Sequence, residues 1–248
     1  MKADTPPSAT VAPFLRNRFL ATLATADRAA IEPNVKTGRF EQGKILYEQG
    51  GDIDQAYFPL TGMISIVALL KDGDKAVEVA TIGNEGAAGT VTGFGPSHAF
   101  NRAIVQVSGL MSWLDARHLE AAVQRSNALR NHIVRYNELV TAQIQQSVAC
   151  NALHTVQARL SRWLLQTHER IDSNIIPLTQ EFLSEMLGVR RSTVTEIASE
   201  LQARELIRYR RGKIEILDAG RLKEAACECY ETVRRRTNKY FPLAGDVQ

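Results

Sequence analysis

The chain has 248 residues, of which 44% are hydrophobic and 23% are charged, as in folded globular domains. At about 100–200 residues per domain, this length allows two ordinary domains. The formal net charge of +3 at pH 7 is too small to indicate or exclude a nucleic-acid partner. The distribution of charge along the chain therefore has to decide that question.

The cysteine content and the N-terminus bear on location. The three cysteines, Cys150, Cys227 and Cys229, are an odd and sparse set, unlike a disulfide framework. Reduced thiols are typical of the cytoplasm. Residues 1–13 lack the apolar run of a signal peptide, and no stretch approaches the roughly 20 apolar residues of a membrane span. We predict a cytoplasmic protein that does not contact a membrane, with residues 1–13 as a mobile tail.

The first half of the chain changes from helical to strand-like spacing. Residues 14–35 have apolar side chains at helical intervals, and Pro33 is predicted to end this helix. From Arg39 to Asp115, short apolar runs are separated by glycine and Asp-Gly turns. These runs include residues 64–67, 77–80 and 104–107. Many short strands with regular turns predict a β-roll, so that residues 14–117 form a β-domain.

A long helical region follows. No glycine occurs between Asp115 and Gly188, and residues 118–171 have helical spacing almost throughout. Ser126 is a candidate N-cap. The apolar seam of the helix comprises Leu129, Ile133, Tyr136, Val140, Ile144 and Val148. The seam can pack on the chain's own β-domain, but a helix that runs past one small domain needs another partner. We predict a dimerisation helix within residues 118–154.

The next segment has the pattern of a helix-turn-helix. Thr179 can cap a helix that buries Phe182, Leu183, Met186 and Leu187, and Gly188 supplies the left-handed backbone of a sharp turn. In the following helix, four apolar residues at i, i+3, i+4 and i+7 face the core: Val194, Ile197, Ala198 and Leu201. The opposite face carries Arg191, Ser192, Thr195, Glu196 and Ser199.

The polar face of this second helix has the chemistry of a major-groove reader. Arg191 can donate two hydrogen bonds to guanine, Glu196 can accept from cytosine, and the Thr195 methyl group can contact thymine. Ser192 and Thr193 at the helix start suit phosphates or base edges. The alternative is an ordinary helical hairpin with a solvated polar face.

Residues 205–217 favour the DNA-binding interpretation, because they have the pattern of a strand, a turn at Gly212 and a second strand, which is a wing. Residues 190–213 contain seven Lys or Arg and three acidic residues, an excess that suits the DNA backbone. We place a winged helix-turn-helix in residues 155–248. The predicted DNA-contacting residues are Arg190, Arg191, Ser192, Thr193, Thr195, Glu196, Arg211 and Lys213.

From about Phe14 to Asp218 the order of these parts resembles the Crp/Fnr superfamily of bacterial transcription factors. The resemblance is carried by residues 39–52, Tyr57–Gly62, the long helix, Ala158–Leu165, the Leu187–Val194 turn and the Arg211–Ile214 wing. It implies an α+β fold: an N-terminal double-stranded β-helix (a jelly-roll-like β-roll), a long dimerisation helix and a C-terminal winged helix-turn-helix. It also implies a homodimer on near-palindromic double-stranded DNA, with RNA polymerase as a further partner if the protein activates transcription.

The ligand pocket departs from the family's cyclic-AMP pattern. Thr90 occupies the position of the family's ribose-binding glutamate, and the phosphate-binding arginine is absent or displaced by one residue to Arg102. Such a shift on a strand turns the side chain to the other face. We therefore do not expect cyclic AMP to bind in the usual mode. Residues 86–89 could present backbone donors to an anion or form a simple turn. The candidate pocket residues are Gly86, Gly89, Thr90, Asn101 and Arg102.

The sequence predicts no metal centre. The first cysteine is Cys150, so the N-terminal iron–sulfur ligands of the oxygen-sensing branch are missing. Cys227 and Cys229 lie in an apparent C-terminal helix, where side chains two residues apart diverge by about 200°. They are interpreted as packing or surface thiols, with redox sensing as an alternative. The five histidines, residues 98, 118, 132, 154 and 168, are assigned structural or solvent roles.

Two other function classes compete with a transcription regulator. A cupin-like β-barrel enzyme would need several His and Glu on strands, but His98 is the only histidine between Arg39 and Asp115. A cyclic-nucleotide-type ligand-binding module without DNA binding would serve some other activity, and we see no room in these 248 residues for that activity. We predict a protein that is not an enzyme. Its β-domain signals to the DNA through a hinge at residues 150–155.

Overall fold

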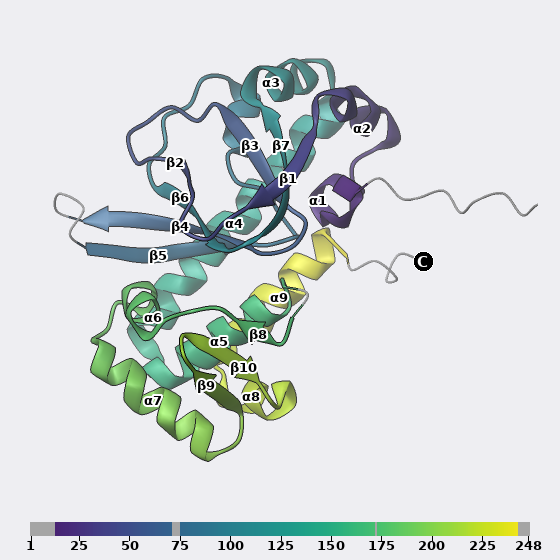
Figure 1. Ribbon diagram of the computed structural model, residues 1–248. Coiled ribbons are helices and arrows are strands. Elements are labelled where there is room, and N and C mark those ends of the chain that lie inside the picture. Colours follow the sequence, from purple (N-terminus) through teal and green to yellow (C-terminus); the bar gives the residue numbers. More distant parts are fainter. Residues whose placement is uncertain (1–12, 71–74, 172, 243–248) are drawn as a thin grey trace, which may run out of the picture.

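The computed structural model describes residues 13–70, 75–171 and 173–242. The predicted mobile tail, residues 1–13, lies outside these ranges except for Pro13. Figure 1 shows two lobes, an N-terminal β-roll with its short helices and a C-terminal unit, with helix α4 running from one lobe into the other. Among the described residues, no helix is long and apolar enough to cross a bilayer.

The predicted N-terminal helix is broken into four short segments. These are η1 (Pro13–Arg16), α1 (Arg18–Ala21), α2 (Thr25–Ile31) and η2 (Glu32–Asn34). The first break lies at Asn17, whose side-chain oxygen accepts a hydrogen bond from the Leu20 backbone N–H and so caps α1. Its amide nitrogen also donates to the carbonyls of Pro59 and Gly86, both at 2.8 Å. The prediction of one continuous helix over residues 14–35 was wrong, because Asn17 bonds to the β-roll.

The β-roll consists of two antiparallel sheets. One has the order β1-β7-β3 and the other the order β2-β6-β4-β5. The strands are β1 (Lys36–Phe40), β2 (Ile45–Tyr47), β3 (Gln55–Pro59), β4 (Met63–Leu70), β5 (Lys75–Ile82), β6 (Arg102–Val107) and β7 (Gly109–Asp115). The three predicted apolar runs fall within β4, β5 and β6, which confirms that part of the prediction. Helix η3 (Thr90–Phe94) lies in the connection between β5 and β6.

Two helices follow the last strand, α3 (Ala116–Arg125) and α4 (Asn127–Leu153). The Ser126 hydroxyl accepts a hydrogen bond from the Leu129 N–H, so the predicted N-cap is confirmed. The start of α4 packs against its own β-roll, because Leu129, Ile133 and Tyr136 join one buried cluster with Phe19 and other N-terminal residues. The predicted dimer seam is therefore wrong at Leu129, Ile133 and Tyr136, and Val140 packs partly against the same cluster.

The C-terminal unit combines a helical framework with a three-stranded sheet of order β8-β10-β9. Its elements are α5 (Val156–His168), β8 (Ile175–Ile176), α6 (Gln180–Leu187), α7 (Arg191–Ala203), β9 (Ile207–Arg210), β10 (Lys213–Ile216), α8 (Ala219–Ala225) and α9 (Cys229–Tyr240). Helix α9 runs back along α4 (Figure 1), and Phe241 at its end stacks on Phe19 at 5.9 Å between ring centroids. The C-terminal helix thus ties the C-terminal unit to the first residues of the β-roll lobe.

The two lobes are in direct contact. The Trp163 indole on α5 donates a 2.8 Å hydrogen bond to the Glu78 carboxylate on β5. The Arg170 guanidinium, just after α5, pairs with Glu85, just after β5. Met63 of the β-roll belongs to the main core cluster of the C-terminal unit. The lobes therefore share part of their core in this conformation.

Candidate nucleic-acid interface

The α6–turn–α7 segment has the predicted helix-turn-helix geometry. The Thr179 hydroxyl accepts from the Phe182 N–H and caps α6. Gly188 ends α6 in the left-handed conformation, with φ of 65°, which a glycine adopts without steric cost. The four apolar residues predicted to face the core from α7 are all buried: Val194, Ile197, Ala198 and Leu201.

The opposite face of α7 is open to solvent. All five side chains predicted for this face are exposed: Arg191, Ser192, Thr195, Glu196 and Ser199. Arg190 is the N-cap residue of α7, and its side chain makes no capping hydrogen bond. No side chain therefore caps the start of α7, which carries two arginines, and this arrangement favours an anion such as a phosphate.

Two of the predicted DNA-contacting residues, Thr195 and Thr193, are less available to a ligand than the others. The Thr195 hydroxyl lies 3.0 Å from the Arg191 carbonyl oxygen and 3.1 Å from the Gln180 side-chain oxygen, so it is engaged within the protein. Its methyl group remains available for an apolar contact. Thr193 is half-buried and faces the side of α7 next to the core.

The wing is the β9–β10 hairpin. Arg211 and Gly212 form its tip, and both have left-handed φ angles, 50° and 71°. Arg210, Arg211 and Lys213 are exposed. Arg208 is held at 2.6 Å by Glu215 on the facing strand, so its charge is partly neutralised. Arg211 and Lys213 form no ion pair among the described residues.

Comparison with known proteins identifies the domain that carries this arrangement. A family model described as the Crp-like helix-turn-helix domain matches residues 158–225, which contain α6, α7 and both wing strands. The C-terminal unit therefore contains a Crp-like helix-turn-helix domain. The transcriptional regulator SdrP of Thermus thermophilus is 26% identical over 197 residues, which are 77% of this chain and 94% of SdrP.

Solved structures of Crp/Fnr proteins have the same fold. A Crp/Fnr regulator from Eubacterium rectale superposes with a TM-score of 0.63 at 19% identity, over 87% of this chain and 96% of that one. FixK2 from Bradyrhizobium japonicum gives a TM-score of 0.62 at 16% identity, over 78% of this chain and 98% of its own. The predicted architecture of β-roll, long helix and winged helix-turn-helix is thereby confirmed.

The candidate ligand pocket in the β-roll is filled by the chain's own side chains. Gly86, Gly89 and Thr90 are buried. A Cβ atom on Gly86 would lie 2.3 Å from the Tyr136 hydroxyl oxygen, so Tyr136 occupies the space beside this glycine. That hydroxyl accepts a 2.8 Å hydrogen bond from the Ala87 N–H, and burial raises the pKa of Tyr136. Thr90 donates to the side-chain oxygen of Asn137 on α4 at 3.0 Å.

The other two predicted pocket residues do not join this turn. Arg102 lies at the start of β6, and its guanidinium pairs with Glu48 at 2.8 Å. Asn101 precedes it and is half-buried. The five residues chosen from the sequence therefore do not converge on one cavity, because Tyr136 and Asn137 close the turn and Glu48 holds Arg102 elsewhere.

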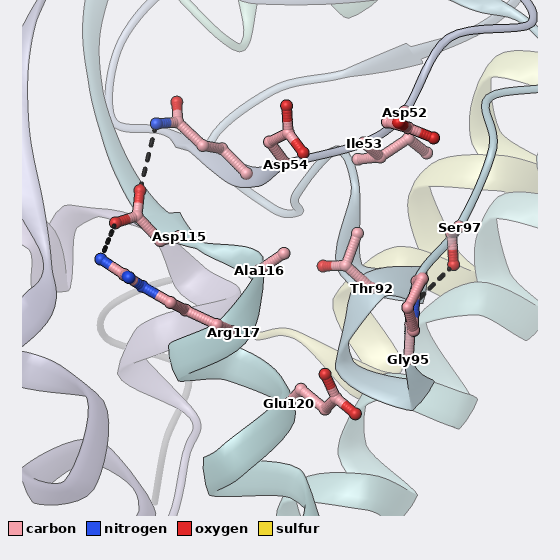
Figure 2. Close-up of a pocket in the computed structure, with 12 residues that line it drawn as sticks. Asp52, Ile53, Asp54, Thr92, Gly95, Ser97, Asp115, Ala116, Arg117 and Glu120 are labelled. Atoms are coloured by element: carbon pink, nitrogen blue, oxygen red, sulfur yellow. Dashed lines mark hydrogen bonds and ion pairs between the residues drawn. The ribbon is translucent and has the colours of Figure 1, made fainter.

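A separate hollow of about 490 Å³ lies between β3, η3 and the start of α3. Figure 2 shows the carboxylates of Asp52, Asp54, Asp115 and Glu120 around it, with Arg117 beside Asp115. The ion pair between Arg117 and Asp115 measures 3.6 Å. The four carboxylates outnumber the one guanidinium, so the lining is negatively charged and disfavours a phosphate-bearing ligand. The charge of this hollow does not suit a cyclic nucleotide.

The cysteines agree with the interpretation as packing thiols, but Cys227 and Cys229 do not lie in one helix. Cys150, Cys227 and Cys229 are all buried, so none is a surface thiol. Helix α9 begins at Cys229, and Cys227 precedes it. The divergence expected within one helix therefore does not apply. The two thiols instead meet Cys150 and His154 at the end of α4. The sequence analysis missed this cluster, although the four-residue spacing of Cys150 and His154 on a predicted helix could have indicated a shared face.

Proposed function

We propose that this chain is a homodimeric, sequence-specific transcription regulator that reads a near-palindromic operator with α7. The observation that carries the proposal is the exposed polar face of α7 beside the cationic tip of the β9–β10 hairpin. A solvated helix alone does not explain why two arginines, a helix N-terminus and a basic hairpin share one side of the C-terminal unit. A DNA duplex is complementary to all three features.

Within this proposal, base reading falls to three side chains of α7. Arg191 donates two hydrogen bonds to guanine O6 and N7, and Glu196 accepts from a cytosine amino group. Thr195 presents its methyl group to thymine, in keeping with its internally bonded hydroxyl. Ser192, one residue after Arg191, donates to a phosphate or a base edge.

The backbone contacts come from both sides of α7. Arg190 and the first N–H groups of α7 meet one phosphate. Arg211 and Lys213 on the wing meet the neighbouring backbone, and Thr193 supports the helix start from its half-buried position. Each neutralised phosphate adds to the salt dependence of binding without selecting a sequence.

The homodimer is proposed to form along the outward side of α4. Val134, Thr141, Ile144 and Val148 are spaced by seven, three and four residues, so they share one helical face. This face is turned by roughly 100° around the helix axis from Leu129, Ile133 and Tyr136, which are buried in the chain's own core. The side chain of Val148 is 65% exposed and that of Val134 41% exposed in the single chain. A two-fold partner on this face would place two α7 helices on half-sites about 34 Å apart.

Control is proposed to act through the contact between the lobes. Trp163 and Arg170 hold the C-terminal unit against Glu78 and Glu85 of the β-roll. A signal in the β-roll that favours a second packing would re-aim α7 through the break between α4 and α5. If the outcome is activation, RNA polymerase is a further partner. The protein is accordingly proposed to act in the cytoplasm, where it would bind DNA.

Selection from a random pool of duplex DNA tests the proposal. The expected product is an inverted repeat whose half-sites are one helical turn apart, bound with an affinity that falls steeply as salt rises. A purified chain that enriches no sequence and ignores duplex DNA at low ionic strength would contradict the proposal.

A further inference from the structure

Four side chains with metal-binding chemistry converge where α4 meets the C-terminal unit. They are Cys150, His154, Cys227 and Cys229, and their ligand atoms all lie within 4.8 Å of one another. The three thiols are buried, and the imidazole is partly exposed at the edge of the cluster. None of these residues contributes to α7, the wing or the outward face of α4.

The local structure explains why the four residues meet. Cys150 and His154 are one helical turn apart, so both side chains point from the same side of the last turn of α4. Helix α8 ends at Ala225, and Cys227 lies in the short link before α9. Cys229 is the first residue of α9, which packs on α4. Each pair of ligands thus comes from one end of a helix, and the two helices are in contact.

The separations fit one tetrahedral ion. Cys150 Sγ lies 3.5 Å from Cys227 Sγ, and Cys229 Sγ lies 3.5 Å from His154 Nδ1. Zinc–sulfur bonds of about 2.3 Å and zinc–nitrogen bonds of about 2.0 Å place tetrahedral ligand atoms about 3.5–3.8 Å apart. An iron–sulfur cluster would have to fit several atoms between these ligands, and their spacing leaves room for one.

The surroundings of the cluster match those of metal ligands. His154 presents Nδ1 to Cys229, while its Nε2 lies 3.2 Å from the Glu228 carboxylate. Carboxylates commonly orient metal-binding imidazoles in this way. The Gln146 amide donates a 3.0 Å hydrogen bond to Cys229 Sγ. Such donors stabilise the negative charge of a bound thiolate.

Two arginines compensate the charge that a loaded site would carry. Three thiolates, one neutral imidazole and one divalent ion have a net charge of −1. Arg159 and Arg162 are both near enough to Cys150 to act on its charge. Arg159 is buried and donates to the Leu187 carbonyl at 2.6 Å, while its Nε has no hydrogen-bond partner among the described residues. A buried guanidinium at this place is offset by a negatively charged metal site.

We propose that Cys150, His154, Cys227 and Cys229 bind one thiophilic divalent ion of the zinc class in a closed, structural site. On binding, each thiol loses its proton to solvent and the ion takes four protein ligands. The bound ion fastens the end of α4 to the start of α9. It thereby fixes the break between α4 and α5 that separates the dimer helix from the C-terminal unit.

The metal site itself does not depend on the proposed function. Its effect on DNA affinity does, since that effect requires α7 to bind an operator. Metal binding is therefore measured first in the absence of DNA, so that failure of the metal site and failure of DNA binding are separate results.

The test is a titration of the full-length, reduced and metal-free chain with Co²⁺. We expect one equivalent to produce the visible bands of tetrahedral cobalt together with thiolate-to-cobalt charge transfer, and Zn²⁺ to abolish both. Cys150→Ser, Cys229→Ser and His154→Asn should each lose or shift these bands. His168→Asn is the matched control, because His168 lies on α5 and bonds to Asn174 outside the cluster.

A milder variant separates a loss of metal binding from a loss of folding. Glu228→Gln keeps all four ligands and changes an exposed side chain, and it should weaken Zn²⁺ binding by about 10- to 100-fold in competition with a chelating dye. Absence of tetrahedral cobalt bands in the reduced wild-type chain would overturn the proposal. Bands that are unchanged in the Cys150→Ser and Cys229→Ser variants would overturn it as well.

Discussion

Arg170 Nη2 lies 2.6 Å from Glu85 Oε1, and both side chains are about nine-tenths buried. Glu85 belongs to the turn after β5, and Arg170 follows α5, so the pair spans the two lobes. The aliphatic part of Arg170 lies against Gly83, where a Cβ atom would be only 2.4 Å from its Cγ and Cδ. The absence of a side chain at residue 83 is what lets the guanidinium reach Glu85.

Replacing Arg170 with Met should destabilise the docked state strongly. The change leaves the Glu85 carboxylate buried without its partner, which costs on the order of 3–5 kcal/mol. A melting temperature lower by roughly 6–20 °C is expected for a chain of this size. Arg208→Met is the control, because the exposed Arg208–Glu215 pair should contribute less than about 1 kcal/mol. Equal melting temperatures for the two variants would contradict the importance of the buried pair.

The contact between Glu78 and Trp163 should make stability depend on pH. Burial raises the pKa of Glu78 to about 7, although hydrogen bonds from Ser65 and Trp163 and the nearby charges of Arg162 and Arg170 oppose the rise. The folded carboxyl therefore holds its proton to a higher pH than the unfolded one. Its contribution to stability is complete below the unfolded value of 4.5, declines as pH rises toward 7, and is absent above that.

Glu78→Gln isolates this effect, since glutamine still accepts from Trp163 and does not titrate. Thermal unfolding of both proteins is followed between pH 5 and pH 8. The wild-type chain should lose more stability than the variant over this interval. His132, whose pKa is lowered by burial, is common to both proteins and cancels in the comparison. Parallel pH profiles would show that Glu78 is ionised throughout.

Local sequence patterns were sufficient for the helix-turn-helix. The spacing of Val194, Ile197, Ala198 and Leu201 marks the buried face of α7 whatever that face packs against, and Gly188 marks the turn through its own backbone freedom. Both signals are contained within a few residues. For this reason the polar face of α7 and the wing could be located without a structure.

The prediction of the dimer seam was wrong in the first turns of α4, and the spacing of apolar residues could not have prevented this error. An apolar stripe shows which side of a helix is buried, but does not show whether its own chain or a partner buries it. The first turns of α4 pack against Phe19 and other residues far away in sequence, so Ile133 and Tyr136 are buried in the chain's own core. Only Ile144 and Val148, near the end of the stripe, remain on the outward side.

The predictions of the ligand pocket and of one helix containing both Cys227 and Cys229 were wrong. They depended on long-range contacts and on a helix boundary that the local sequence does not indicate. Nothing near Gly86 indicates that Tyr136, 50 residues later, fills the space beside it. The cysteine argument depended on one helix containing both Cys227 and Cys229, and α9 begins two residues later than that argument requires. Helix ends are the least certain part of a helix prediction.

Val148→Asp tests the outward face of α4. A charge at each copy of a buried dimer contact should prevent association, so monomers are expected in analytical ultracentrifugation. Leu110→Asp places the same charge on an exposed apolar residue of β7, away from α4, and should leave the dimer intact. A dimer that survives Val148→Asp would place the interface on another face.

Arg211→Asn tests the wing as a backbone contact. Asparagine tolerates the left-handed φ of 50° at this position, so the hairpin should keep its shape while it loses a charge. Affinity should fall by a similar factor for every DNA sequence, and the slope of log K against log salt should become shallower by about one. A change in base preference would show that the wing reads sequence.

The central claim is that the exposed face of α7 reads base pairs. Its most direct test is an anisotropy titration of wild type and Arg191→Ala against the selected operator and against operators with single base changes. At the base pair that Arg191 reads, the wild-type chain should discriminate by about 1–3 kcal/mol, and the variant should not. If Arg191→Ala lowers affinity for all of these sequences equally, or leaves discrimination intact, α7 is not the reading element.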